Sequence, residues 1–176
     1  MNQDATNGQP HRIGVSSMID RKIEDIRAHF APVIGEKILR YETAELLHDG
    51  TWGSWPDLPI RLHVGTDRIV AVSWSRFDDL WLADGPSLPF SIGESVVRWV
   101  VNGLEEINAV VGASIQSVML GRGEMTIGGR EIEIWTRLVI ELDRGWLEVF
   151  NALDENGYAF HTERPDGIFV PCIPAR

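Results

Sequence analysis

The chain has 176 residues, of which 44% are hydrophobic and 24% are charged. These proportions are typical of a globular domain, and a chain of this length buries enough surface to fold without disulfides or metals. Sixteen Lys and Arg against 26 Asp and Glu give a formal net charge of −10. Such a surface repels phosphate backbones, which argues against DNA or RNA as a partner, and it attracts basic proteins.

Cysteine content and hydropathy indicate the compartment. The single cysteine, Cys172, excludes an intramolecular disulfide and a multi-cysteine zinc site. The polar N-terminus lacks the basic start and apolar core of a signal peptide. The most apolar stretch, residues 96–111, is too short and too charged to span a bilayer. We therefore expect a soluble cytoplasmic protein with no membrane association.

The first predicted element is a helix. Residues 1–12 are polar and have no apolar periodicity, which predicts a flexible N-terminal tail ahead of one domain over residues 13–176. From residue 17 onward the apolar residues recur at helical spacing. They predict a helix over 17–30, which Pro32 ends.

Alternating polar and apolar residues predict strands in the next segment. Residues 37–47 favour a strand, and His48-Asp49-Gly50 after it is a turn signal. Residues 58–64 and 69–75 alternate around a glycine turn, which predicts a β-hairpin. Residues 80–82 favour one more short strand.

A second main helix is predicted after residue 90. The run Ser91-Ile92-Gly93-Glu94 has capping-box spacing. The apolar residues behind it form a wide face that ends at Gly112. The pattern predicts a helix over 93–111 that is central to the fold and packs on a sheet.

Strands are predicted in the rest of the chain. Their ranges are 114–120, 131–142, 146–151, 158–162 and 168–170. The glycine-rich run 121–126 is interpreted as a hairpin turn, and Pro165-Asp166-Gly167 as the turn of a terminal hairpin. The predicted fold class is therefore α+β, a mainly antiparallel β-sheet with two main helices.

Two segments of the chain resemble each other at an ungapped offset of 76 residues. Residues 57–79 and 133–155 share five identities in 23 positions. The identical pairs are Arg61/Arg137, Leu62/Leu138, Asp67/Asp143, Arg68/Arg144 and Asp78/Asp154. The pattern predicts two equivalent hairpins in a duplicated αβββ or βαβββ module, with halves near 13–90 and 91–176. Coincidence is the alternative explanation.

If residues 12–15 and 80–82 are strands, each half has the element order β-α-β-β-β. This order resembles the modules of the vicinal oxygen chelate family. The resemblance implies a site between the halves, and with it a small-molecule-binding protein or a metal-dependent enzyme. The histidine and glutamate metal ligands of that family cannot be placed in this sequence.

The sequence contains no catalytic signature. The histidines form no HxH or HExxH pattern, and no GxSxG motif occurs. The run 121–126 lacks the ending of a phosphate-binding loop. The acidic pairs Asp78-Asp79 and Asp154-Glu155 are typical of turns, with partner contact and metal binding as the alternatives. We expect no enzymatic activity, no metal and no cofactor.

Tryptophans and aspartates gather around the first predicted hairpin. The candidate partner-binding residues are Trp52, Trp55, Asp78, Asp79, Trp81 and Asp84. Tryptophan supplies a large rigid contact area, and the acids suit a basic partner. We expect a bacterial immunity or antitoxin-type inhibitor that occludes a basic partner, such as a toxin enzyme. The paired-module enzyme or small-molecule binder, and an accessory domain of a larger assembly, are the alternatives.

Overall fold

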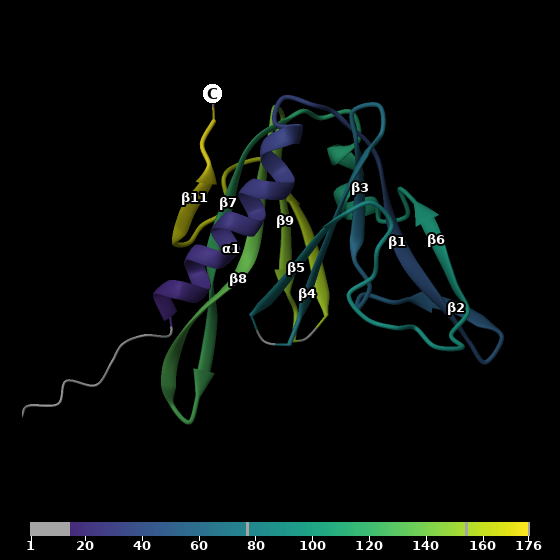
Figure 1. The fold of residues 1–176 in the computed structure, drawn as a ribbon. Coiled ribbons are helices and arrows are strands. Elements are labelled where there is room, and N and C mark those ends of the chain that lie inside the picture. The colour runs from purple at the N-terminus through teal and green to yellow at the C-terminus, as the bar shows by residue number, and fades with distance from the viewer. Residues whose placement is uncertain (1–14, 77, 154, 176) are drawn as a thin grey trace, which may run out of the picture.

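The computed structural model describes residues 15–76, 78–153 and 155–175. Its fold is β-rich α+β, with one α-helix among the described residues and two antiparallel sheets (Figure 1). The helices are α1 (Val15–Phe30) and the short 3-10 helices η1 (Ala31–Val33) and η2 (Glu105–Val110). The strands are β1 (Ile38–His48), β2 (Thr51–Ser54), β3 (Ile60–Val64), β4 (Arg68–Ser75), β5 (Asp79–Asp84), β6 (Val97–Val101), β7 (Ile115–Ile127), β8 (Arg130–Leu142), β9 (Gly145–Asn151), β10 (Asn156–His161) and β11 (Phe169–Ile173). The predicted tail at residues 1–12 lies outside the described residues.

The strands form two sheets that share one core. The first sheet has the order β2-β1-β3-β4-β5, with β6 paired to β1, and the second has the order β10-β9-β8-β7-β11. Neighbouring strands in both sheets are antiparallel. The prediction of a mainly antiparallel β-sheet is therefore confirmed, as are the hairpin of β3 and β4 and the strand over residues 80–82.

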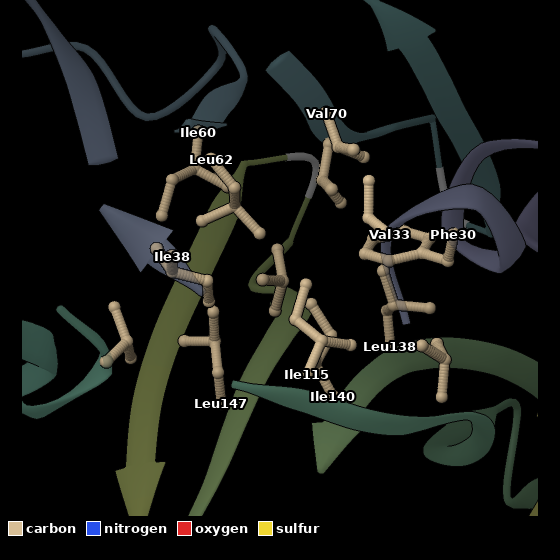
Figure 2. Close-up of a cluster of buried hydrophobic side chains, with 14 of the residues drawn as sticks. Phe30, Val33, Ile38, Ile60, Leu62, Val70, Ile115, Leu138, Ile140 and Leu147 are labelled. Atoms are coloured by element: carbon tan, nitrogen blue, oxygen red, sulfur yellow. The ribbon is translucent and has the colours of Figure 1, made fainter. Parts of the chain in front are cut away.

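Helix α1 packs its apolar face on both sheets. Ile26 and Phe30 are fully buried, and so is Val33 in η1, which begins where Pro32 ends the helix. Figure 2 shows Phe30 and Val33 among the side chains of both sheets, which belong to the same cluster. Burying each large side chain stabilises the fold by roughly 2 kcal/mol. The predicted first helix is confirmed.

A reciprocal exchange of backbone hydrogen bonds joins the two sheets. The amide of Gly35, which follows η1, donates to the carbonyl of Ile115 at 2.7 Å. The amide of Gly112, which follows η2, donates to the carbonyl of Ile38 at 2.6 Å. Both glycines have positive φ, +88° and +83°. The turn before β1 is therefore bonded to the first residue of β7, and the turn before β7 is bonded to the first residue of β1.

The predicted helix over 93–111 is wrong. This segment contains β6, then a turn at Asn102 with φ of +50°, and then the short helix η2. The sequence before Asn102 is rich in valine, whose branched Cβ disfavours helix and suits a pleated sheet. The capping-box residues also make a turn, because the amide of Ser95 donates to the carbonyl of Ile92.

The glycine-rich run 121–126 is not a turn. It continues β7, and the hairpin turn lies at Gly128 and Gly129, whose φ angles are +58° and +77°. Gly121 and Gly123 instead allow close approach, since a Cβ on either would collide with the side chains of Phe169 and Thr136 respectively.

The prediction of a terminal hairpin is also wrong. Strand β10 pairs with β9, whereas β11 pairs with β7 at the opposite edge of the second sheet. The connecting residues 162–168 therefore cross the sheet and do not turn back on β10. Local turn composition could not reveal this, because the edge that β11 joins is formed by a distant part of the chain.

The two repeat segments fold as hairpins with different registers. In the first hairpin Val64 pairs with Arg68, and in the second Ile140, its counterpart at the 76-residue offset, pairs with Leu147. The turns therefore do not coincide, and the duplicated module is not confirmed. The element order β-α-β-β-β is not present either, because the second half lacks its α-helix and Val15 begins α1.

Changing Gly35 to Ala should destabilise the protein by about 1–2 kcal/mol, because alanine is strained at positive φ. Nothing lies within 4 Å of an added Cβ, so the cost is conformational alone. Gly53→Ala is the matched control, since its surroundings are equally open and its φ is not positive. Urea unfolding of both variants measures the difference, and equal midpoints would contradict the assigned role of Gly35.

Candidate functional site

The structure separates the six predicted partner-binding residues. Trp52 lies on β2 with the guanidinium of Arg98 4.5 Å from its ring centroid. Asp79 and Asp84 lie at opposite ends of β5 and are both exposed, so they do not form one acidic group. Trp81 lies between them and is half-buried. Trp55 makes an edge contact with Phe90, with the two ring centroids 6.2 Å apart.

Asp78 is engaged inside the fold. Its carboxylate lies 3.1 Å from Nζ of Lys22 on α1, which also donates to the carbonyl of Trp135 at 3.0 Å. Burial lowers the pKa of Lys22, and the charge of Asp78 opposes that shift. Lys22 therefore joins α1 to both sheets, through the ion pair with Asp78 and the hydrogen bond to Trp135. Asp78 thus has a structural contact that the sequence did not reveal.

Part of the predicted set borders a hollow of about 730 Å³ between α1 and β5. The hollow includes Asp79 and Trp81, and Phe90 connects it to Trp55. Its other charged lining residues are Arg21, Asp25, His29, Asp57 and Arg76. Three aspartates thus face two arginines and a histidine, so the charge of this hollow is mixed.

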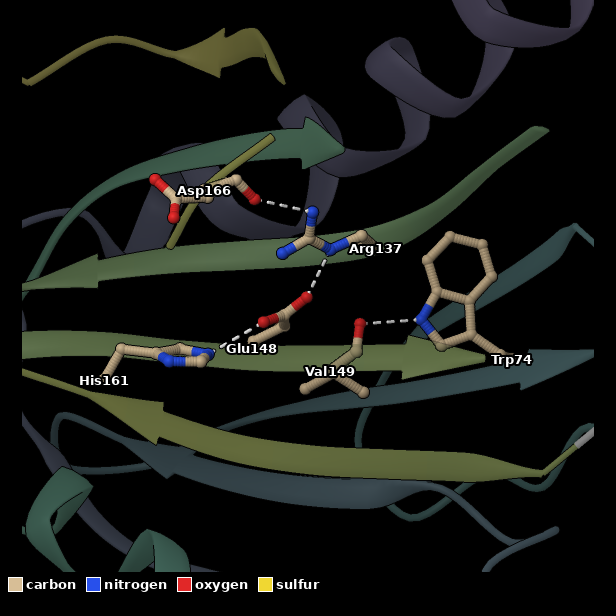
Figure 3. Close-up of polar contacts among 6 residues, drawn as sticks. All are labelled: Trp74, Arg137, Glu148, Val149, His161 and Asp166. Atoms are coloured by element: carbon tan, nitrogen blue, oxygen red, sulfur yellow. Dashed lines mark hydrogen bonds and ion pairs between the residues drawn. The ribbon is translucent and has the colours of Figure 1, made fainter. Parts of the chain in front are cut away.

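A second candidate site lies on the face of the second sheet that points away from the core. There Nε of Arg137 donates to one oxygen of Glu148, and the other oxygen lies 2.8 Å from Nε2 of His161 (Figure 3). Nη1 of Arg137 donates to the carbonyl of Asp166 at 2.9 Å. Glu148 is buried, whereas the side chain of His161 is 34% exposed. The three strands β8, β9 and β10 each supply one member of this cluster.

The first sheet carries a cluster of the same composition. Glu42 on β1 lies 3.0 Å from Nε2 of His63 and 3.9 Å from Nη1 of Arg61. Here the arginine is covered, because its guanidinium lies 3.4 Å from the ring centroid of Trp99 and donates to the carbonyl of Pro86. Burial lowers the pKa of Arg61. This cluster is closed, and the cluster of Arg137 is open.

The open cluster lies in a trough that crosses the second sheet. Two adjoining hollows of about 600 and 500 Å³ share Gly123, Glu124, Met125 and Arg137. The first reaches Asp166–Ile168, and the second reaches Leu153 and His161. We call this continuous depression the outer trough. Its far wall is the distal ribbon, residues 122–135, where the β7–β8 hairpin extends beyond the other strands (Figure 1).

Large apolar side chains are exposed around the outer trough. The exposed fractions are 54% for Ile127, 36% for Ile132, 90% for Leu153 and 58% for Ile168. The distal ribbon presents Met125 and Ile132 on one side, since they pair directly across the hairpin. This surface was not expected from the sequence, because residues 121–126 were interpreted as a turn. The alternation of Met125 and Ile127 with polar residues was the available signal.

The described residues contain no group of three or more His, Cys, Asp and Glu placed to hold a metal ion. Cys172 is buried, and burial raises its thiol pKa to about 11, so it is poorly suited to act as a nucleophile. None of the helices that the structure describes has the length and apolar character needed to cross a bilayer.

Comparison with known proteins gives no family for this chain. No family model matches it, and neither the curated proteins nor the solved structures contain a significant match. The site must therefore be interpreted from its own geometry.

Changing Asp78 to Ala should lower the free energy of unfolding by about 2 kcal/mol, because Lys22 would be left buried without its carboxylate. Asp79→Ala is the matched control and should change it by less than about 0.5 kcal/mol, since Asp79 is exposed. Chemical denaturation of the two variants checks this difference. If Asp78→Ala leaves the free energy of unfolding unchanged, the ion pair is not structural and Asp78 is again a candidate partner-binding residue.

Changing Leu153 to Asn should raise stability by about 1 kcal/mol. Leu153 has a φ of +63° and is almost fully exposed, so it is strained and buries little apolar surface. Asparagine tolerates this conformation better. A thermal midpoint no higher than that of the parent protein would show that leucine is not strained here.

Proposed function

We propose that this chain is a protein-binding domain that acts as an inhibitor of a basic partner, in the manner of an immunity or antitoxin protein. The observation that carries the proposal is the outer trough with its exposed isoleucines and leucine. Exposed apolar side chains around a depression are typical of surfaces that another molecule covers. The polar cluster in the floor of the trough supplies fixed hydrogen-bonding groups.

The charge of the protein supports a basic partner. The chain carries a net charge of −10. Three acids, Glu124, Glu131 and Asp166, border the trough against two arginines, Arg122 and Arg137, and Arg137 is already paired with Glu148. A positively charged partner is attracted over a distance set by ionic strength, so the association rate falls as salt is added. The hollow of Asp79 and Trp81 is proposed as a further contact surface of the same interaction.

A small-molecule-binding or enzymatic function is the second candidate. It is favoured by Arg137 and His161, which Glu148 holds together in the floor of a hollow of about 500 Å³ with apolar walls. Perturbed or oriented polar groups in an apolar pocket are a common arrangement of ligand sites. Retention of a small molecule through purification, and its loss on changing Arg137 to Met, would favour this function.

We also propose a duplication with an offset of 77 residues. Gly35 and Gly112 are related by this offset, as are Ile38 and Ile115, and their hydrogen bonds are reciprocal. This relation supports a common origin of the two sheets.

Changing Ile168 to Glu should abolish partner capture from an extract of the native host. The substitution places a charge on the apolar edge of the trough, where a partner would desolvate it. Val96→Glu is the matched control, because Val96 is 54% exposed and does not line the trough. Each variant is used as bait, and retained proteins are identified by mass spectrometry. A partner held equally by both variants and the parent protein would contradict binding at the trough.

A further inference from the structure

The edge of β7 in the distal ribbon is not paired with another strand of the described chain. Strand β11 pairs with β7 only up to Gly121, after which the amide of Arg122 donates to the carbonyl of Ile168 at 2.9 Å. Backbone groups of alternate residues in a strand point to the same edge. Beyond Arg122, the amides and carbonyls of Glu124 and Thr126 therefore point to the open edge.

The space beside this edge suits a polypeptide backbone. Five consecutive residues of β7, 122–126, line the hollow of about 600 Å³. Consecutive residues of a strand point to opposite faces. A depression that all of them line must therefore lie along the edge of the strand and reach both faces. The opposite wall, Asp166–Ile168, is the segment that leads into β11, so an added strand would continue the line of β11.

The two faces of the distal ribbon differ in character. One face carries Met125 paired with Ile132, and the other carries Glu124 paired with Glu133, with Glu131 next to them. Arg122 lies on the same face as Glu124, but its amide is already bonded to Ile168, so the open part of the edge begins at the glutamate. Like charges that are directly opposite destabilise a sheet, whereas a cation on a neighbouring strand stabilises it. An added strand would thus place basic residues beside the glutamates and apolar residues beside Met125 and Ile168.

The same charges disfavour a second copy of this chain as the occupant. Edge-to-edge pairing of two β7 strands would bring Glu124 of each copy close to the acidic face of the other. A basic segment would not be repelled in this way. Charge complementarity therefore favours a basic segment over a second copy of this chain.

We propose that the open edge of β7 binds an extended segment of the partner by strand addition, and that the segment alternates basic with apolar residues. This rests on the proposed protein-binding function and specifies its ligand. Backbone hydrogen bonds to Glu124 and Thr126 supply affinity, and the alternating side chains supply selectivity.

The probe is a short blocked peptide in which lysine alternates with valine or isoleucine. It is titrated into the 176-residue chain, and binding is followed by backbone amide shifts in NMR. The shifts should be largest at Glu124 and Thr126. Thr126→Pro should weaken binding about tenfold or more, because it removes an edge-facing donor. Thr126→Ala is the matched variant: it also removes the threonine side chain but keeps the amide, so it should bind at least about tenfold more tightly than Thr126→Pro. A peptide with glutamate in place of lysine should not bind.

A second arm does not depend on the folding of any variant. The same peptide, N-methylated at alternate residues to remove the donors that face β7, should lose binding to the parent protein by a similar factor. Strand addition is overturned if the lysine peptide does not bind, or if both Thr126→Pro and N-methylation leave its affinity unchanged. If Ile168→Glu still prevents capture of the native partner in that case, the protein-binding function stands and only the mode of binding is wrong.

Discussion

The architecture depends on the exchange of backbone hydrogen bonds between Gly35 and Ile115 and between Gly112 and Ile38. The exchange fixes the start of each sheet against the other, and their inner faces then share one core with α1. Because side chains alternate along a strand, orienting the inner faces also sets the outer ones. Arg61 and Arg137 consequently lie on faces that point away from the core.

The two outer faces differ in what covers them. In the first sheet Trp99 from β6 stacks on the guanidinium of Arg61 and closes its cluster. In the second sheet the connection through Asp166 crosses above Arg137 and accepts one hydrogen bond, but it leaves His161 partly exposed. The cover is incomplete beside the distal ribbon, and the outer trough is what remains. The candidate site is therefore a consequence of how the chain passes from β10 to β11.

The elements that could be predicted from sequence are those whose signal is local. Apolar spacing identified α1, and alternation identified the hairpin of β3 and β4. The helix over 93–111 failed because a strand, a turn and a short 3-10 helix happen to place valines and isoleucine at helical intervals. Gly121 was wrongly assigned to a turn. A glycine is needed there because the ring of Phe169, 48 positions later in the chain, leaves no room for a Cβ. The alternation of Met125 and Ile127 could have indicated the distal ribbon, but the rest of the outer trough depends on the connection 162–168, which leads to a distant sheet edge and has no local signal.

An open strand edge is a hazard for a soluble protein, because it templates association with other edges. Proteins commonly protect such edges with lysine, whereas the distal ribbon carries two arginines, Arg122 and Arg130, and an excess of acid in Glu124, Glu131 and Glu133. Glutamate protects against self-association through repulsion, as lysine would, but it does not repel a basic partner. The same side chains thus oppose aggregation of an acidic protein and favour a cationic segment. In this chain the net sign of the protecting charge, more than its presence, is what supports a cationic segment as the proposed occupant of this edge.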